Sequence, residues 1–132
     1  VFSNTEEKEW LETTVHPEIH YLRDQKMAQI QKTQETKAKS NEQSFLVAWI
    51  VPLLFEKGMQ NEVDFTVCIA STKSTQFIRL KKRNWTDDEI CRRLQNQWPV
   101  ERKASIADFV IWNEFNLDIL EKQINLILDE IK

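Results

Sequence analysis

Three apolar runs rich in β-forming residues place the strongest constraint on what this chain can fold into. They cover residues 44–52 (SFLVAWIVP), 65–70 (FTVCIA) and 109–112 (FVIW). An uninterrupted apolar run is typical of a strand that is covered on both faces, as in a parallel sheet. Helical patterns follow the second run over 73–83 and 86–96, and the third over 116–131. Strands that alternate with helices predict an α/β fold with about three parallel strands and flanking helices.

The region before the first apolar run is expected to be helical. Residues 5–15 show helical spacing, and residues 17–39 repeat it before giving way to polar sequence. A proline at position 17 disfavours the α conformation at His16 and suits the first turn of a new helix. The sequence therefore predicts two helices that break at His16-Pro17, followed by a surface loop.

Length and composition indicate one globular domain over residues 1–132. The chain is 41% hydrophobic and 30% charged, which is typical neither of a disordered nor of a low-complexity chain. No apolar run approaches the roughly 20 residues that span a bilayer. The first ten residues carry acids and do not resemble a secretory signal. We expect no membrane partner and a cytoplasmic protein.

Cysteine and histidine contents argue against a protein-built metal site. The two cysteines fit no metal-binding spacing, and the two histidines occur in no HExxH pattern. Cys68 lies in an apolar run and is expected to be buried, whereas Cys91 lies among charged residues and is expected to be partly exposed. No metal ligand is therefore assigned.

Charge is unevenly distributed along the chain. Residues 71–105 hold nine basic and four acidic side chains, whereas acids exceed bases by four in both 1–70 and 106–132. A local basic excess within a protein of net charge -3 argues against nucleic-acid binding and favours a confined anion site. The alternative is an ordinary solvated helix face.

Only one glycine, Gly58, occurs in the chain. A phosphate-binding loop of the form GxxxxGK[ST] or GxGxxG needs several glycines, because backbone N–H groups must approach the anion closely. Neither loop exists here, so this chain taken alone is not expected to hold a nucleoside triphosphate in the usual α/β manner.

Four collinear stretches nevertheless resemble one family. They are FSNTEEKEWL at 2–11 running into His16-Pro17, VPLLFE at 51–56, TQFIRLKKR at 75–83, and the pattern from Gln97 through Lys103 to ADFVIWN at 107–113. Together they are similar to dephospho-coenzyme A kinase over essentially the whole chain. Two departures occur in the last stretch: Trp112 stands where the family usually has Asp, and no glycine follows Asn113.

The resemblance implies the doubly wound, three-layer fold of a P-loop kinase. It also implies ATP-dependent phosphorylation of the ribose 3′-hydroxyl of dephospho-CoA, the last step of coenzyme A synthesis, with Mg²⁺ bridging the ATP phosphates. The glycine-rich loop of the family precedes the region matched here. The chain is therefore expected to be a fragment of a longer enzyme and inactive alone.

Site residues are carried over from the family motif by motif. By resemblance, residues 71–105 form a basic lid whose Arg79, Arg83 and Lys103 approach ATP. Arg79 and Arg83 are four residues apart, so one helix would present both on the same face. Residues of the dephospho-CoA pocket would be His16, Leu53, Leu54 and Glu56. No catalytic residue is assigned. The non-functional alternatives are a solvated basic face for the two arginines, an ordinary surface carboxylate for Glu56 and a structural role for His16.

In the family's fold, the strand that bears the phosphate-binding loop lies in the middle of the sheet. Strands at 45–51 and 65–70 would then border an empty slot, which costs free energy because backbone groups stay unpaired. We expect another segment, or a second copy of the chain, to fill it by self-association. Direct pairing of 45–51 with 65–70 would contradict this expectation.

Two other function classes remain open from the sequence. One is a non-catalytic binding module that keeps the acceptor pocket and the lid. The other is a P-loop kinase acting on a different nucleoside or nucleotide. A glycine-rich loop in the upstream coding sequence would favour an enzyme over the binding module.

Overall fold

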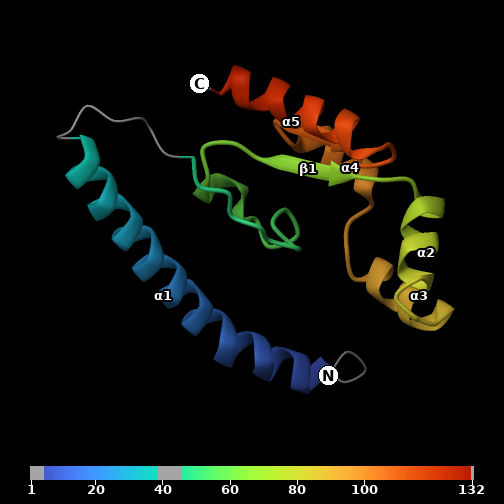
Figure 1. The fold of residues 1–132 in the computed structure, drawn as a ribbon. Coiled ribbons are helices and arrows are strands. Elements are labelled where there is room, and N and C mark those ends of the chain that lie inside the picture. The colour runs from blue at the N-terminus through green and yellow to red at the C-terminus, as the bar shows by residue number, and fades with distance from the viewer. Residues whose placement is uncertain (1–4, 39–45, 132) are drawn as a thin grey trace. The chain divides into compact units, whose positions relative to one another are not determined.

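The computed structural model describes residues 5–38 and 46–131, and its tertiary contacts divide the chain into two compact units, Val1–Trp49 and Ile50–Lys132. The first unit is built on one helix, α1 (Thr5–Ala38), and the second contains a small parallel sheet with its helices (Figure 1). No helix in these two described ranges is long and apolar enough to cross a membrane. The single-domain interpretation stays a prediction.

Helix α1 runs without interruption through Pro17, so the predicted break at His16-Pro17 is wrong. Proline lacks an N–H, and the carbonyl of Thr13 therefore loses its usual helical partner. The loss is confined to one turn, while the remaining residues keep their hydrogen bonds and extend the helix cooperatively. The predicted helix end at residue 39 lies outside the described residues.

Two parallel strands form the sheet of the second unit. Strand β1 (Val67–Ala70) pairs with β2 (Phe109–Trp112) in a register that sets Val67 opposite Phe109 and Ala70 opposite Trp112. The long connection between them contains α2 (Lys73–Lys81), α3 (Asp87–Gln95) and α4 (Val100–Ile106). Helix α5 (Leu117–Glu130) follows β2. This arrangement confirms the predicted α/β class with parallel strands and flanking helices.

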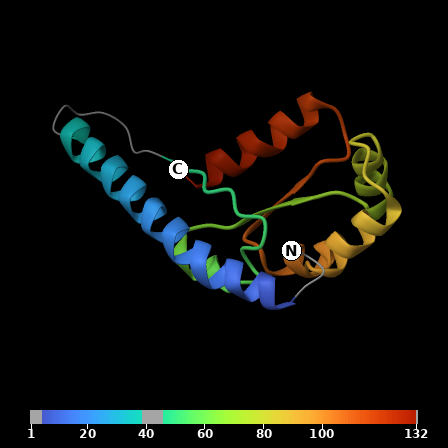
Figure 2. The same cartoon turned by 90° about the horizontal axis from the view of Figure 1, so that it is seen from below.

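Helices lie on both sides of this sheet, but each packs mainly against one of its two strands. In Figure 2, α5 and α4 lie on opposite sides of the strands, with α4 in contact with β1 and α5 with β2. Cys68 and Ala70 of β1 are buried, whereas Val67 and Ile69 on the other face of this strand are exposed. Burial alternates along β1 because only one face of this strand is covered. The uniformly apolar sequence had predicted cover on both faces.

The strand predicted at 44–52 is not formed by residues 46–52, the part of this range that the structure describes. Residues 46–51 have no regular secondary structure, turns begin at Pro52, and residues 44 and 45 lie outside the described residues. Leu46 is 63% exposed and Ile50 is 91% exposed. A strand exists only where a neighbour pairs with its backbone, and among residues 5–38 and 46–131 only β2 pairs with β1. Direct pairing of residues 46–51 with residues 65–70, which would have contradicted the empty slot, is not found in the described part of the protein.

Residues 52–62 form a compact turn region before β1. Gly58 adopts φ 69° and precedes the short 3-10 helix η1 (Met59–Glu62). Phe55 from this region is buried, as are Cys68, Ala70 and Ile111 of the strands and Ile90 of α3. The sole glycine thus serves a left-handed turn position, which other residues adopt at a cost.

The amino ends of the two strands are joined by side chains. Asp108 Oδ2 accepts hydrogen bonds from the backbone N–H of Thr66 at 2.8 Å and from its hydroxyl at 2.6 Å. Asp108 N–H donates in return to the Thr66 hydroxyl at 3.0 Å. These hydrogen bonds, led by the one from the Thr66 hydroxyl, lower the pKa of the Asp108 carboxyl.

Helix α2 ends two residues earlier than the predicted range of 73–83. Asn84 adopts φ 63°, while Asn84 N–H donates to Lys81 O and Trp85 N–H donates to Leu80 O. This pair of hydrogen bonds around a left-handed residue is the Schellman ending of a helix. Arg83 therefore lies in the turn after α2, and its predicted place on a common helix face with Arg79 is wrong.

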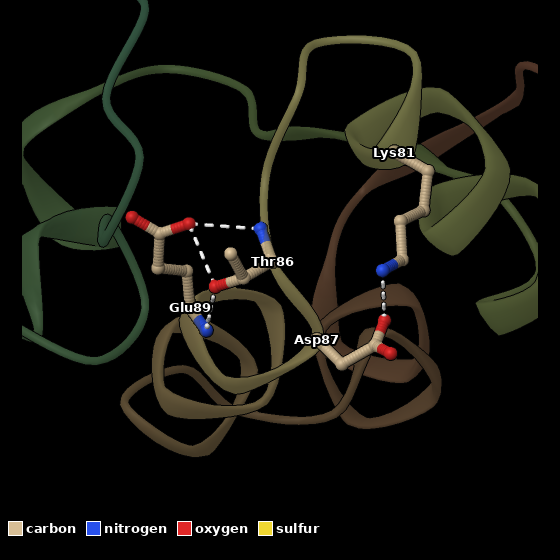
Figure 3. A network of polar contacts seen from close by, with 4 residues as sticks. All are labelled: Lys81, Thr86, Asp87 and Glu89. Atoms are coloured by element: carbon tan, nitrogen blue, oxygen red, sulfur yellow. Dashed lines mark hydrogen bonds and ion pairs between the residues drawn. The ribbon is translucent and has the colours of Figure 1, made fainter.

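Helix α3 begins with a capping box, in agreement with the predicted range of 86–96. The Thr86 hydroxyl accepts a hydrogen bond from Glu89 N–H, and the Glu89 carboxylate accepts one from Thr86 N–H at 2.8 Å (Figure 3). Figure 3 also shows the ion pair between Lys81 and Asp87, which ties the end of α2 to the first turn of α3.

Helix α4 was not predicted, because its seven residues are too few for a periodic apolar pattern.

Candidate functional site

Polar side chains gather where the two parallel strands end, the edge at which open α/β sheets place their ligands. The Asn113 N–H donates to Ala70 O at 2.8 Å, which sets the residues after β2 beside those after β1. The resulting group, here called the carboxyl-edge cluster, consists of Thr72, Thr75, Arg79, Asn113 and Glu114.

Glu114 connects the loop after β2 to the beginning of α2. One of its oxygens accepts from Thr72 N–H, and the other accepts from the Thr75 hydroxyl at 2.6 Å. The Thr75 hydroxyl, followed by the Thr72 N–H, lowers the pKa of the Glu114 carboxyl, because both stabilise the ionised form. A carboxylate at this position also complements the positive end of the helix dipole.

Arg79, predicted as a lid residue, belongs to the same cluster. Its Nη2 donates to Asn113 Oδ1 at 3.4 Å, from one turn further along α2 than Thr75. A hydrogen bond of this length is weak, so the guanidinium remains able to exchange this partner for a stronger acceptor such as a phosphate oxygen.

A second group, here called the Glu56 clamp, consists of Glu56, Gln97, Trp98 and Lys103. Glu56 Oε1 accepts from Trp98 N–H at 2.8 Å and lies 3.3 Å from Lys103 Nζ. The ammonium also donates to Gln97 Oε1 at 3.3 Å. The side chains of Glu56 and Lys103 are 10% and 16% exposed, respectively. Two residues predicted for different substrates are thus brought together as a largely buried ion pair.

Two further features surround the Glu56 clamp. Glu56 Oε2 is buried and has no hydrogen-bond partner within the described part of the protein. Cys68 lies nearby on β1, where burial raises the pKa of its thiol despite the opposing charge of Lys103. The predicted burial of Cys68 and exposure of Cys91 are both confirmed.

The other predicted site residues lie outside these two groups. Arg83 is exposed, and its side chain makes no hydrogen bond or ion pair with the residues that the structure describes. Leu53 and Leu54 are half-buried in the turn region, where their carbonyls accept from Lys57 and Met59 N–H. His16 lies half-buried in α1, in the first unit. Their roles in binding stay predictions.

Sequence reasoning did not single out Thr72, Thr75, Asn113 or Glu114 as site residues. A usable signal was present, because Ser71-Thr72 follows one predicted strand and Asn113-Glu114 follows the next strand of the sheet. Polar residues at the carboxyl ends of adjacent parallel strands meet at one edge. The contact between Glu114 and Thr75 spans 39 residues and carries no local sequence signature.

Comparison with known proteins gives a consistent result. The sequence pattern of the dephospho-CoA kinase family matches residues 1–118. The dephospho-CoA kinase of Lactobacillus johnsonii is 33% identical over 132 residues, which cover 99% of this chain and 62% of that protein. The dephospho-CoA kinase of Trichormus variabilis is 32% identical over 130 residues, which cover 98% of this chain and 60% of that protein.

A solved structure agrees with this relationship. The crystal structure of TT1252 from Thermus thermophilus matches with a TM-score of 0.77 and 29% identity, over 100% of this chain and 63% of that chain. The chain thus spans about 60% of the length of the curated relatives it matches. Both groups of polar side chains described above lie inside the region matched by the family pattern. The chain belongs to the dephospho-CoA kinase family.

Proposed function

We propose that the protein carrying this chain transfers a phosphoryl group from ATP to the ribose 3′-hydroxyl of dephospho-CoA. Within that protein, this chain supplies the acceptor pocket and the basic lid. The observation that carries the proposal is the family match over residues 1–118, which includes the carboxyl-edge cluster and the Glu56 clamp.

The lid contributes positive charge to the reaction. Phosphoryl transfer depends mainly on positioning and on electrostatic stabilisation of the transferring group. Arg79 lies at the carboxyl edge of the sheet with one weak hydrogen bond, and Arg83 is exposed in the turn after α2. Both are suited to approach a polyphosphate. Lys103 is held by Glu56, so it reaches ATP only after this ion pair opens.

The chain offers basic side chains that match the charge of ATP, but it has no glycine-rich loop to bind the ATP phosphates. Gly58, the only glycine, occupies a left-handed turn rather than a glycine-rich loop. Among the described residues, no three His, Cys, Asp or Glu side chains are grouped to hold a metal ion. Mg²⁺ would neutralise phosphate charge when bound with ATP, and this part of the enzyme would act on the polyphosphate through its arginines.

The acceptor pocket is assigned to Leu53, Leu54 and Glu56 of the second unit, while the assignment of His16, in the first unit, stays a prediction from the family resemblance. The two leucines offer half-buried apolar surface, and Glu56 Oε2 is an acceptor without a partner in the described region. A hydroxyl or amide N–H of dephospho-CoA would satisfy this oxygen. Glu56 would then hold Trp98 and Lys103 with one oxygen and the acceptor with the other.

Calorimetric titration of the 132-residue chain tests this division of labour. We expect binding of dephospho-CoA, no saturable binding of ATP with Mg²⁺, and no phosphoryl transfer by the chain alone. Glu56→Gln should weaken dephospho-CoA binding, whereas the matched control Glu121→Gln, an exposed position in α5, should not. Absence of dephospho-CoA binding by a folded chain would contradict the proposed pocket.

The setting of the protein is proposed from its charge distribution and its exposed apolar side chains. We infer a cytoplasmic protein without nucleic-acid or membrane partners, because its basic excess is confined to residues 71–105. We also infer self-association through the exposed edge of β1, because Val67 and Ile69 are apolar and exposed beside it. Sedimentation at increasing protein concentration tests the second inference.

A further inference from the structure

Glu114 attaches the loop after β2 to the lid at two points. Its two oxygens are both occupied, one by Thr72 N–H and the other by the Thr75 hydroxyl. A single hydrogen bond lets two segments pivot about each other, but two bonds from one planar carboxylate restrict rotation as well as distance. The first turn of α2 is therefore held in a defined orientation against the end of the sheet.

The same loop contacts α2 a third time, one turn further on. Thr75 and Arg79 are four residues apart and share one face of the helix. Asn113, adjacent to Glu114, accepts from Arg79 Nη2 at 3.4 Å. Contacts at Thr72, Thr75 and Arg79 thus align one face of α2 with residues 113–114.

This alignment depends more on Glu114 than on Asn113. The Thr75–Glu114 hydrogen bond is 2.6 Å long and involves a carboxylate, whereas the Arg79–Asn113 contact is 3.4 Å long and involves a neutral amide. Each contact has one charged partner, so their lengths decide, and the hydrogen bond of 2.6 Å is stronger than the contact of 3.4 Å. Arg79 is therefore placed by the attachment at the start of its helix rather than by its own partner.

We propose that Glu114 is a positioning residue that orients α2 and thereby sets Arg79 at the carboxyl edge of the sheet. The orientation itself follows from contacts within this chain. Its use in placing Arg79 against a polyphosphate rests on the proposed function.

Hydrogen exchange and NMR of the 132-residue chain test the proposal without any substrate. Glu114→Ala should accelerate exchange of the Thr72 amide by about tenfold, because it removes a charge-assisted hydrogen bond. It should also shift the side-chain signals of Arg79 and Asn113. The matched control Glu121→Ala removes an exposed carboxylate from α5 and should change none of these signals.

Substitutions on the helix side distinguish orientation from general stability. Thr75→Val deletes the donor while keeping the side-chain shape, and it should reproduce the Arg79 shift. Thr75→Ser keeps the hydroxyl and should restore the native signals. Signals of Thr66 and Asp108, at the opposite end of the sheet, report whether each variant remains folded.

The proposal is overturned if Glu114→Ala and Thr75→Val leave Thr72 exchange and the Arg79 signals as they are in Glu121→Ala. If the Thr66 and Asp108 signals are lost in Glu114→Ala alone, that variant is not folded. The comparison of Thr75→Val with Thr75→Ser then decides the test. Failure of dephospho-CoA binding in calorimetry would reject the proposed pocket while leaving this orientation test unaffected.

Discussion

Two residues of the Ile50–Lys132 unit have left-handed backbone angles, and each lies in a turn between elements. Gly58 at φ 69° precedes η1, and Asn84 at φ 63° separates α2 from α3. Glycine adopts such angles without a steric penalty, and asparagine tolerates them better than most residues. Residue type and backbone angle agree at both sites, so each turn is encoded locally.

Gly58→Ala is expected to destabilise the chain by about 1–2 kcal/mol, the usual cost of a left-handed conformation for a residue with a Cβ. An added Cβ meets no atom within 4 Å, so the effect is one of backbone strain alone. Urea unfolding measures the free energy, and Glu121→Ala at an exposed helical position serves as the control. An unchanged unfolding free energy would show that the turn adopts a different conformation in solution.

At the scale of whole elements, two glutamates attach residues 71–105, the proposed lid, to the rest of the second unit. Glu114 holds the beginning of α2, and Glu56 holds Trp98 and Lys103 beside and within α4. Between these attachments, the Lys81–Asp87 ion pair joins the end of α2 to the first turn of α3. In the proposed lid, α2 and α3 are therefore expected to move together between these two attachments.

Lys103→Met tests the second anchor. Removing the ammonium leaves the Glu56 carboxylate, which is 10% exposed, without its counter-charge. We expect destabilisation of up to about 3 kcal/mol, the lower end of the range for breaking a buried ion pair. Lys122→Met at an exposed position of α5 is the matched control.

A double variant makes this prediction specific. Glu56→Gln combined with Lys103→Met keeps an acceptor for Trp98 N–H while removing both charges, so it should recover part of the loss. Equal destabilisation in the single and double variants would mean that Lys103 contributes through packing and not through its charge.

Three carboxylates across the second unit share the same chemical environment. Asp108, Glu114 and Glu89 each accept hydrogen bonds from a threonine hydroxyl and a threonine N–H. The pKa of each is lowered; for Glu89 the leading cause is the Thr86 N–H. The whole molecule should therefore lose stability in acid.

The sign of this pH dependence follows from linkage. A carboxyl whose pKa is lower in the folded state stabilises the fold fully above its unfolded pKa, near 4. That contribution disappears as the pH falls from there through the folded pKa. Unfolding by urea between pH 7 and 3 should show Asp108→Asn differing from the native chain most at pH 7, with the difference shrinking as the pH falls below about 4. A constant difference over this range would contradict the prediction.

Features that depend on neighbouring residues could be predicted from the sequence. Strand 109–112 and the caps at Thr86 and Asn116 follow from local composition and from short polar side chains that bond nearby N–H groups. Family motifs also selected Arg79, Glu56 and Lys103, which the structure places in the two polar groups. The short helix α4 was missed because a seven-residue helix shows less than two full turns of periodicity.

Local sequence by itself determined helices α2, α3 and α5, the α/β class and the missing phosphate loop, because hydrogen bonds within a few residues and backbone preferences decide these features. Only the tertiary structure decided that residues 46–51 form no strand and that α1 continues through Pro17. It also decided that Glu56 pairs with Lys103 and that Glu114 holds α2. A strand needs a backbone partner, and these contacts join residues about 40 positions apart, so their energies arise only when the chain has folded.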